Sequence, residues 1–228
     1  METLDTFAAA EVSTWTIKKL SEYVGGLSTP SKMPGFGYGI PAKECKTGGK
    51  LQSVEGSTCH GCYALKGNYL WPVVEGAQYK RLNAIKNSPL WAECMAELIN
   101  RKKCEFFRWH DSGDLQSVKH FAMICAIAES TPTVSHWIPT REYKFVSDYI
   151  SSGGIIPANL CVRFSAHMIG GNVPKFPRLK GLVTISTVTK ITEYEDAYNC
   201  PSRFQDNSCG DCRACWSNDV FHVDYHYH

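Results

Sequence analysis

The sequence predicts an α/β fold with a mostly parallel β-sheet, built as an incomplete (β/α) barrel or as an open sheet. Short segments rich in β-branched and aromatic residues alternate with amphipathic segments in the second half of the chain, a pattern typical of βα units. A length of 228 residues suits one domain of this class. Because no repeat, low-complexity tract or linker is evident, we expect a single domain over residues 1–228.

Periodicity places the individual elements along the chain. Helical spacing of apolar residues predicts helices over roughly the first 25 residues and over 88–103, 114–130 and 142–152. Strand-like patterns predict strands at 105–110, 134–140, 160–166, 181–188 and 220–228. Ser88 and Asp114 are candidate N-caps of two of these helices. In the last strand, alternation places four residues on one face, which we expect to be solvated rather than metal-binding: His222, Asp224, His226 and His228.

Composition and charge exclude several functional classes. No apolar run approaches the ~20 residues that cross a bilayer, so no membrane partner is expected. The N-terminus carries Glu2 and Asp5 where a secretory signal needs a basic start, which favours the cytoplasm. A net charge of +2 without a cluster of Lys and Arg does not indicate bulk binding of nucleic acid.

The C-terminal segment 199–216 concentrates four of the eleven cysteines, which are Cys200, Cys209, Cys212 and Cys215. In a reducing compartment such thiols are more often metal ligands than disulfides, and thiolates select iron–sulfur clusters, zinc or copper(I). Three cysteines at C-x2-C-x2-C spacing suit the separate irons of a cluster better than one tetrahedral zinc, and a distant cysteine followed by proline is similar to bacterial ferredoxins. We expect a 4Fe–4S cluster here, with structural zinc as the alternative.

A second group of thiols, Cys45, Cys59 and Cys62, lies in the irregular stretch 27–64, which is rich in Gly, Pro, Ser and Lys. Long irregular stretches in compact domains are usually functional or mobile. Three thiolates on a cluster leave one iron open to a ligand. The alternative is one metal site that these thiols close together with His60 or with the C-terminal cysteines. The remaining cysteines are read as small buried residues: Cys94, Cys104, Cys125 and Cys161.

Polar residues follow two predicted strands, at the sheet edge where ligands of parallel α/β folds bind. His110, Ser112, Gly113 and Asp114 come after one strand, and Arg141 comes after the next. They are candidates for binding a small-molecule cofactor or ligand. The alternative is that Ser112 or Asp114 only caps the following helix.

Four stretches give the sequence its resemblance to a known family: "CYALKG", "FRWHDSGDLQS", "WIPTRE" and "CPSRF…CGDCRACW". The chain resembles the bacteriophage gene product 88 family from about Ser31 onward, which implies a phage-encoded protein in the cytoplasm of the infected bacterial host. That family is in turn similar to radical SAM enzymes, which have a partial TIM barrel. This similarity implies a cluster on Cys45, Cys59 and Cys62 that binds S-adenosylmethionine, with residues 112–114 against its amino group and an auxiliary cluster on the C-terminal cysteines.

The function expected from the sequence is that of an iron–sulfur protein carrying out radical SAM-like or other redox chemistry. One alternative is a non-enzymatic binding factor with structural iron–sulfur or zinc sites. The other is a ferredoxin-like electron carrier.

Overall fold

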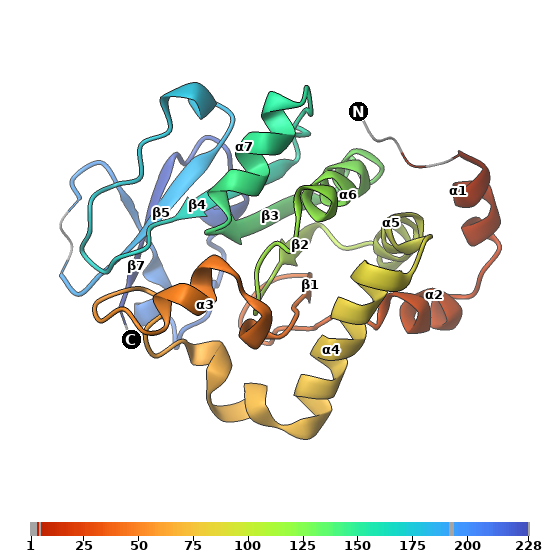
Figure 1. Cartoon of the computed structure of the whole chain (residues 1–228), viewed down its shortest axis with the longest axis horizontal. Helices are drawn as coiled ribbons and strands as arrows, with labels where there is room; N and C mark the ends of the chain where they lie inside the picture. Colours follow the sequence, from red (N-terminus) through yellow and green to blue (C-terminus); the bar gives the residue numbers. More distant parts are fainter. Residues whose placement is uncertain (1–3, 5, 192–193, 228) are drawn as a thin grey trace.

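The computed structural model describes residues 4, 6–191 and 194–227, and in this part of the chain seven strands form one all-parallel, open sheet. The strand order is β1-β2-β3-β4-β5-β7-β6, so the first five strands lie side by side in chain order (Figure 1). The strands are β1 (Phe36–Tyr38), β2 (Phe106–Trp109), β3 (Ser135–Thr140), β4 (Leu160–Ser165), β5 (Thr184–Thr189), β6 (Tyr198–Asn199) and β7 (His222–His226).

The helices connect these strands. The α-helices are α1 (Thr6–Ser13), α2 (Ile17–Val24), α3 (Thr47–Leu51), α4 (Pro72–Asn87), α5 (Trp91–Lys102), α6 (Val118–Glu129) and α7 (Tyr143–Ser151). The short 3-10 helices are η1 (Ala42–Glu44), η2 (Tyr63–Leu65), η3 (Gly67–Leu70), η4 (Pro177–Leu179), η5 (Pro201–Phe204) and η6 (Ala214–Trp216). None of the helices in the described ranges is long and apolar enough to cross a membrane.

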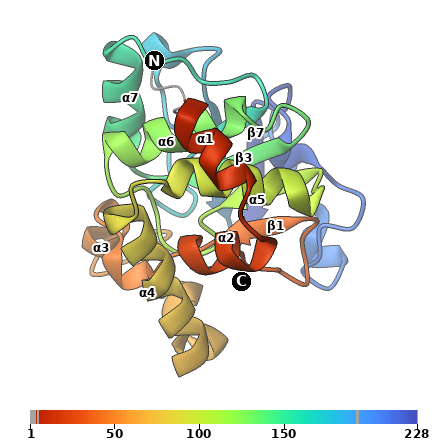
Figure 2. The same ribbon diagram turned by 90° about the vertical axis from the view of Figure 1, so that its right-hand side faces the viewer.

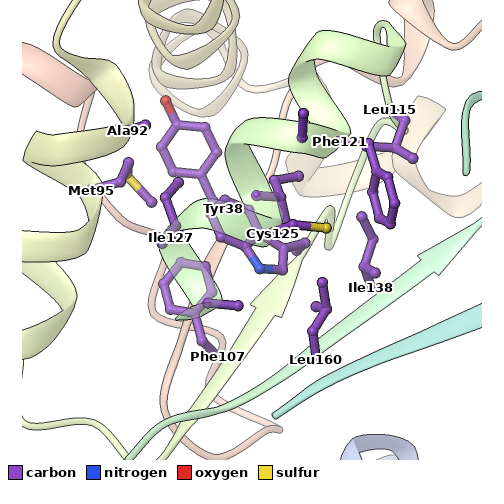
Figure 3. Close-up of a cluster of buried hydrophobic side chains, with 14 of the residues drawn as sticks. Tyr38, Ala92, Met95, Phe107, Leu115, Phe121, Cys125, Ile127, Ile138 and Leu160 are labelled. Atoms are coloured by element: carbon purple, nitrogen blue, oxygen red, sulfur yellow. The ribbon is translucent and has the colours of Figure 1, made fainter. Parts of the chain in front are cut away.

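One face of the sheet, which we call the outer face, packs against the helices. Right-handed crossovers between strands in sequential order put their connecting helices on the same side of a sheet. Phe107, Ile138 and Leu160 from three neighbouring strands meet Met95 of α5 and Phe121 of α6 in one buried cluster (Figure 3). This cluster is the main hydrophobic core.

The opposite, inner face of the sheet is covered by the C-terminal segment. Side chains alternate along a strand, so Arg108, Trp137 and Arg163 point away from the helices. Trp216 donates its indole N–H to the carbonyl oxygen of Phe107 at 3.1 Å, and its ring lies 5.1 Å from that of Trp137. Segment 199–216 is therefore anchored on the sheet rather than being a free tail.

Most predicted elements are confirmed within a few residues, and the differences have physical reasons. The first predicted helix is two helices, of which α2 ends at Gly25 with φ of 80°. Ser88 closes α4 instead of capping α5, and Ser117 rather than Asp114 caps α6 by accepting a hydrogen bond from the His120 N–H at 3.0 Å. The sequence reading missed β1, α3 and α4. Figure 2 shows α4 projecting from the body of the molecule, where much of its surface has no core to face.

Candidate metal centres

Cys45, Cys59 and Cys62, here called the cysteine trio, are brought together after β1. Gly48 of α3 lies next to two of these sulfurs. A Cβ at that position would lie 3.4 Å from Cys59 Sγ and 3.7 Å from Cys45 Sγ. A turn closed by the Cys62 N–H and the Cys59 carbonyl at 3.2 Å links the other pair. The shared metal site of these three thiols stays a prediction.

The loop that carries the trio is tied to the end of β4. The N–H of Thr58 donates to the carbonyl oxygen of His167 at 2.8 Å, and its hydroxyl donates to that of Ala166 at 3.0 Å. Ser57 also pairs with Met168 in an isolated antiparallel bridge. The trio therefore lies at the carboxyl edge of the parallel sheet, where such folds bind ligands.

Arg141 is the cationic residue of this site. Its backbone N–H donates to Asp114 Oδ2 at 2.9 Å, and its Nε donates to Thr58 Oγ1 at 3.0 Å. Burial raises the pKa of Cys45 and of Cys59, and the charge of Arg141 acts in the opposite direction on both. Arg141 thus favours the thiolate form that a metal requires.

The 112–114 segment is occupied by internal contacts. Ser112 Oγ donates to the carbonyl oxygen of Ile40 at 2.7 Å, and Gly113, with φ of 79°, leaves no room for a side chain because a Cβ would lie 2.3 Å from Ile40. Asp114 accepts hydrogen bonds from the N–H groups of Leu115 and Arg141 and from the hydroxyl of Thr140. Burial raises the pKa of Asp114 to about 6. These residues join the loops after β1, β2 and β3.

His110 points to the helix-covered side. It has a φ of 58° and its ring lies edge-on to His120 of α6, with a centroid separation of 5.3 Å. Burial lowers the pKa of both imidazoles, that of His120 to about 3. Both ring nitrogens of His110 are buried without a hydrogen-bond partner among the described residues, so its ligand role stays a prediction.

Cys200, Cys209, Cys212 and Cys215, here called the cysteine quartet, form the second group. The Cys212 N–H donates to the Cys209 carbonyl at 3.0 Å, which closes a tight turn. The pKa of Cys209 is raised by burial and by the nearby Cys200 and Cys212, and burial with Cys200 raises that of Cys215 to about 12. Two tyrosine hydroxyls face the quartet, with Tyr198 Oη 3.3 Å from Cys212 Sγ and Tyr225 Oη 3.1 Å from Cys215 Sγ.

Two arginines of the inner face lie beside the quartet. Arg163 is fully buried and donates to the carbonyl oxygens of Ile185, Ala214 and Val220. Arg108 stacks over the Trp137 ring at 4.6 Å. None of the ion pairs among the described residues involves either arginine, and both charges lower the pKa of Cys215. A buried cation without a carboxylate partner is costly unless another anion neutralises it.

The sequence reading did not select these arginines, although a signal was present. In "EFFRWH" and "LCVRFSA" each arginine is the only basic side chain within its β-strand. A charged residue at a sheet position that is buried on both faces requires a specific partner.

The other predicted ligand, His60, and the remaining four cysteines differ in their surroundings. His60 is exposed, with Nδ1 3.0 Å from the carbonyl oxygen of Gln52. Cys94, Cys125 and Cys161 are buried as expected, whereas Cys104 is half-buried. In the described parts of the chain, no group of three or more His, Cys, Asp and Glu side chains is arranged to hold a metal ion.

The histidine-bearing strand β7 alternates as predicted, but its face is not solvated. His222 and Asp224 are buried, and both contact the Thr187 hydroxyl, His222 through Nε2 at 2.8 Å and Asp224 through Oδ1 at 2.6 Å. His228 lies outside the described residues. The expected solvated face is therefore wrong for these two side chains, because their hydroxyl contacts with β5 bury them.

Comparison with known proteins gives one match. No curated protein and no solved structure matches the chain. The family model described as gene product 88 matches residues 9–218, which include both cysteine groups and the whole sheet up to β6. The chain therefore belongs to the gene product 88 family.

Proposed function

We propose that this protein binds iron–sulfur clusters and carries out redox chemistry at the cysteine trio. The observation that carries the proposal is the position of Arg163 beside Cys215 of the quartet, because this fully buried cation forms no ion pair among the described residues. Four metal-bound thiolates would carry the negative charge that Arg163 lacks among its hydrogen-bond partners, which are backbone carbonyl oxygens and the Cys161 thiol. The cysteine quartet thus fits an anionic, thiolate-ligated centre.

A cluster suits this quartet better than a single ion. Each cysteine of a cluster binds a different iron, so its sulfurs are spread more widely than around one zinc. The tyrosine hydroxyls near Cys212 and Cys215 supply hydrogen bonds of the kind that tune cluster potentials.

The cysteine trio is the proposed reactive centre. Three protein thiolates on a four-iron cluster leave one iron free, and a cluster bound this way supplies one-electron chemistry to a small molecule held beside it. The trio follows the first strand of a sequentially ordered parallel sheet, at the edge where such sheets bind ligands. Arg141 neutralises part of the thiolate charge and holds the loop through Thr58.

Residues 112–114 do not fit their expected role toward the amino group of S-adenosylmethionine. The Ser112 hydroxyl and both oxygens of Asp114 already have protein partners, and Gly113 packs on Ile40. We therefore derive no step through that cofactor from this segment. The cluster proposal depends on the thiols and the arginines alone.

The test is a count of iron, acid-labile sulfide and zinc per chain in protein purified without oxygen from the cytoplasm of a bacterial host. We expect about eight irons and eight sulfides per chain. Cys59→Ala and Cys212→Ser are each expected to retain about four, since each variant damages one centre. One zinc per chain without sulfide would contradict the proposal.

A structural metal site in a non-enzymatic binding factor is the second candidate. The observation that favours it is the anchoring of segment 199–216 on the inner face through Trp216 and Arg163. A metal there contributes directly to folding free energy. In this case chelation lowers the melting temperature of the unmodified protein, Cys212→Ser unfolds, and Cys59→Ala leaves both ligand binding and redox behaviour unchanged.

A further inference from the structure

Next to the cysteine trio, two polar side chains have groups that the protein does not use. Arg141 donates through Nε to Thr58, but among the described residues its two terminal nitrogens have no hydrogen-bond or ion-pair partner. His167 has a buried Nε2 atom that likewise lacks a partner. Buried polar atoms are rarely left unpaired, so His167 Nε2 indicates a ligand or water, whereas the terminal nitrogens of the half-buried Arg141 are open to solvent or a ligand.

Thr58 contacts both residues at the sheet edge, Arg141 through its side chain and His167 through its backbone. Its hydroxyl accepts from Arg141 Nε at 3.0 Å, while its N–H donates to the carbonyl oxygen of His167 at 2.8 Å. The His167 ring is held by stacking on Tyr143, with the centroids 4.8 Å apart and the planes inclined by 6°. Both unused groups are therefore on rigid supports beside Cys59.

The charge of Arg141 acts on the thiols of the trio, and its two terminal nitrogens are free to bind a further anion. Two neighbouring acidic side chains are already engaged, because Asp114 accepts three hydrogen bonds and Glu142 accepts both the N–H and the hydroxyl of Thr47. A guanidinium with both terminal nitrogens unused matches the two oxygens of a carboxylate.

His167 adds a second requirement. Burial lowers the pKa of His167, whereas a hydrogen bond with the backbone of Arg141 raises it, which is the effect of a ring N–H donating to a carbonyl oxygen. In a neutral imidazole the other nitrogen then accepts a hydrogen bond. Nε2 is thus available to accept a hydrogen bond from an N–H or O–H group of the same ligand whose carboxylate binds Arg141.

We propose that Arg141 and His167 form the binding site of a small α-amino or α-hydroxy acid beside the cysteine trio. Arg141 binds the carboxylate, and His167 accepts a hydrogen bond from the neighbouring amino or hydroxyl group. The inference deepens the proposed function by naming the ligand class of the reactive centre. It rests on that function only for the role of the trio, because binding itself needs no cluster.

The experiment uses one six-carbon series as probes, namely L-norleucine, 2-hydroxyhexanoate, hexanoate, hexylamine and hexyl phosphate. Binding to the full chain, purified without oxygen, is measured by ligand-observed NMR. We expect the amino and hydroxy acids to bind about tenfold more tightly than hexanoate, and hexylamine not to bind. Iron and sulfide are counted in every preparation, so loss of the clusters is distinguished from loss of ligand binding.

Three variants assign the contacts. Arg141→Gln is expected to weaken norleucine binding by about tenfold or more. If this variant does not fold, Arg141→Lys replaces it in the test, because lysine keeps the charge but lacks the two parallel N–H donors of the guanidinium. His167→Phe keeps the stacking on Tyr143 and should abolish the preference for norleucine over hexanoate. Arg178→Gln is the control, since this exposed arginine precedes β5 at the opposite end of the strands.

Four results would overturn the assignment. They are no binding of norleucine at millimolar concentration, tighter binding of hexyl phosphate than of norleucine, binding of hexylamine equal to that of hexanoate, and unchanged norleucine affinity in Arg141→Lys. Binding with the expected preferences in a preparation without iron would retain this inference while contradicting the cluster proposal.

Discussion

Arg163 Nη2 donates to the carbonyl oxygen of Ala214 at 3.1 Å, which links the middle of the sheet to the segment that carries the cysteine quartet. The same guanidinium also binds the carbonyl oxygens of Ile185 and Val220. One side chain from β4 thereby fixes the path of the chain on both sides of η6. The position of Cys215 next to this cation follows from the fold and not from local spacing alone.

Replacing this arginine should therefore affect stability and metal content together. Arg163→Met fills a similar volume but leaves several buried carbonyl oxygens without donors, and we expect the free energy of unfolding to fall by about 3 kcal/mol. Iron bound by the quartet should fall as well. Urea unfolding and iron analysis check this, with the exposed Arg178→Met as control, expected within about 0.5 kcal/mol of the unmodified protein. A stable Arg163→Met protein with full iron content would contradict the assigned role.

The buried histidines predict loss of stability in acid. Burial lowers the pKa of His120 from 6.5 to about 3, so the folded state keeps this imidazole neutral at pH values where the unfolded chain binds a proton. Above pH 6.5 both states hold the imidazole neutral, and the full stability is present. As the pH falls toward 3 the free energy of unfolding decreases, and this loss reaches about 3 kcal/mol at pH 4.5. Urea unfolding at pH 7 and 4.5 measures the change. His120→Phe should reduce the dependence on pH by about one proton per chain, and an unchanged slope would show that another group is responsible.

Much of the sheet could be predicted from the sequence, because strands β2 to β5 are apolar or β-branched on a buried sheet. Strand β1 has only three residues and is flanked by glycines, and its stability comes from pairing with β2, in the register Phe36 with Phe107. Pairing over such a distance in the chain leaves no local signal. Helix α4 was missed because only Gln78, Arg81, Leu82, Ala84 and Ile85 of its sixteen residues are buried, so its apolar periodicity is weak.

Within the candidate site, the sequence predicts contacts between residues that are close in the chain. It does not predict where a side chain points when the backbone leaves regular strand geometry. The C-x2-C intervals predict the proximity of Cys59 to Cys62 and of Cys209 to Cys212, where a backbone hydrogen bond closes each turn, but say nothing about Cys45 or Cys200. His110 could not be assigned in the same way, because its positive φ turns the side chain toward α6 just after the regular alternation of β2 ends. The engagement of Asp114 by Thr140 and Arg141 likewise depends on the neighbouring strand β3.

The anchoring role of Thr58 can be tested by one nearly isosteric change. Thr58→Val removes the hydroxyl that accepts from Arg141 Nε and donates to the Ala166 carbonyl oxygen. We expect a loss of about 1 kcal/mol in global stability and faster amide hydrogen exchange in residues 56–60. Thr133→Val, at an exposed position, is the control. Unaltered exchange in the loop would mean that the trio is held by its other contacts.

Two adjacent glycines of α3 separate an effect on the trio from an effect on the helix. A Cβ on Gly48 would lie 3.2 Å from Cys45 Cβ and 3.4 Å from Cys59 Sγ, whereas a Cβ on Gly49 would meet nothing within 4 Å. Gly49→Ala should stabilise the protein by about 0.5–1 kcal/mol, because alanine loses less backbone entropy in a helix. Gly48→Ala gains the same propensity but crowds Cys45 at its Cβ and fills the space next to the Cys59 sulfur, and we expect it to lose about four irons per chain with an unchanged circular dichroism spectrum. Full iron content in Gly48→Ala would show that no cluster occupies the space between Cys45 and Cys59.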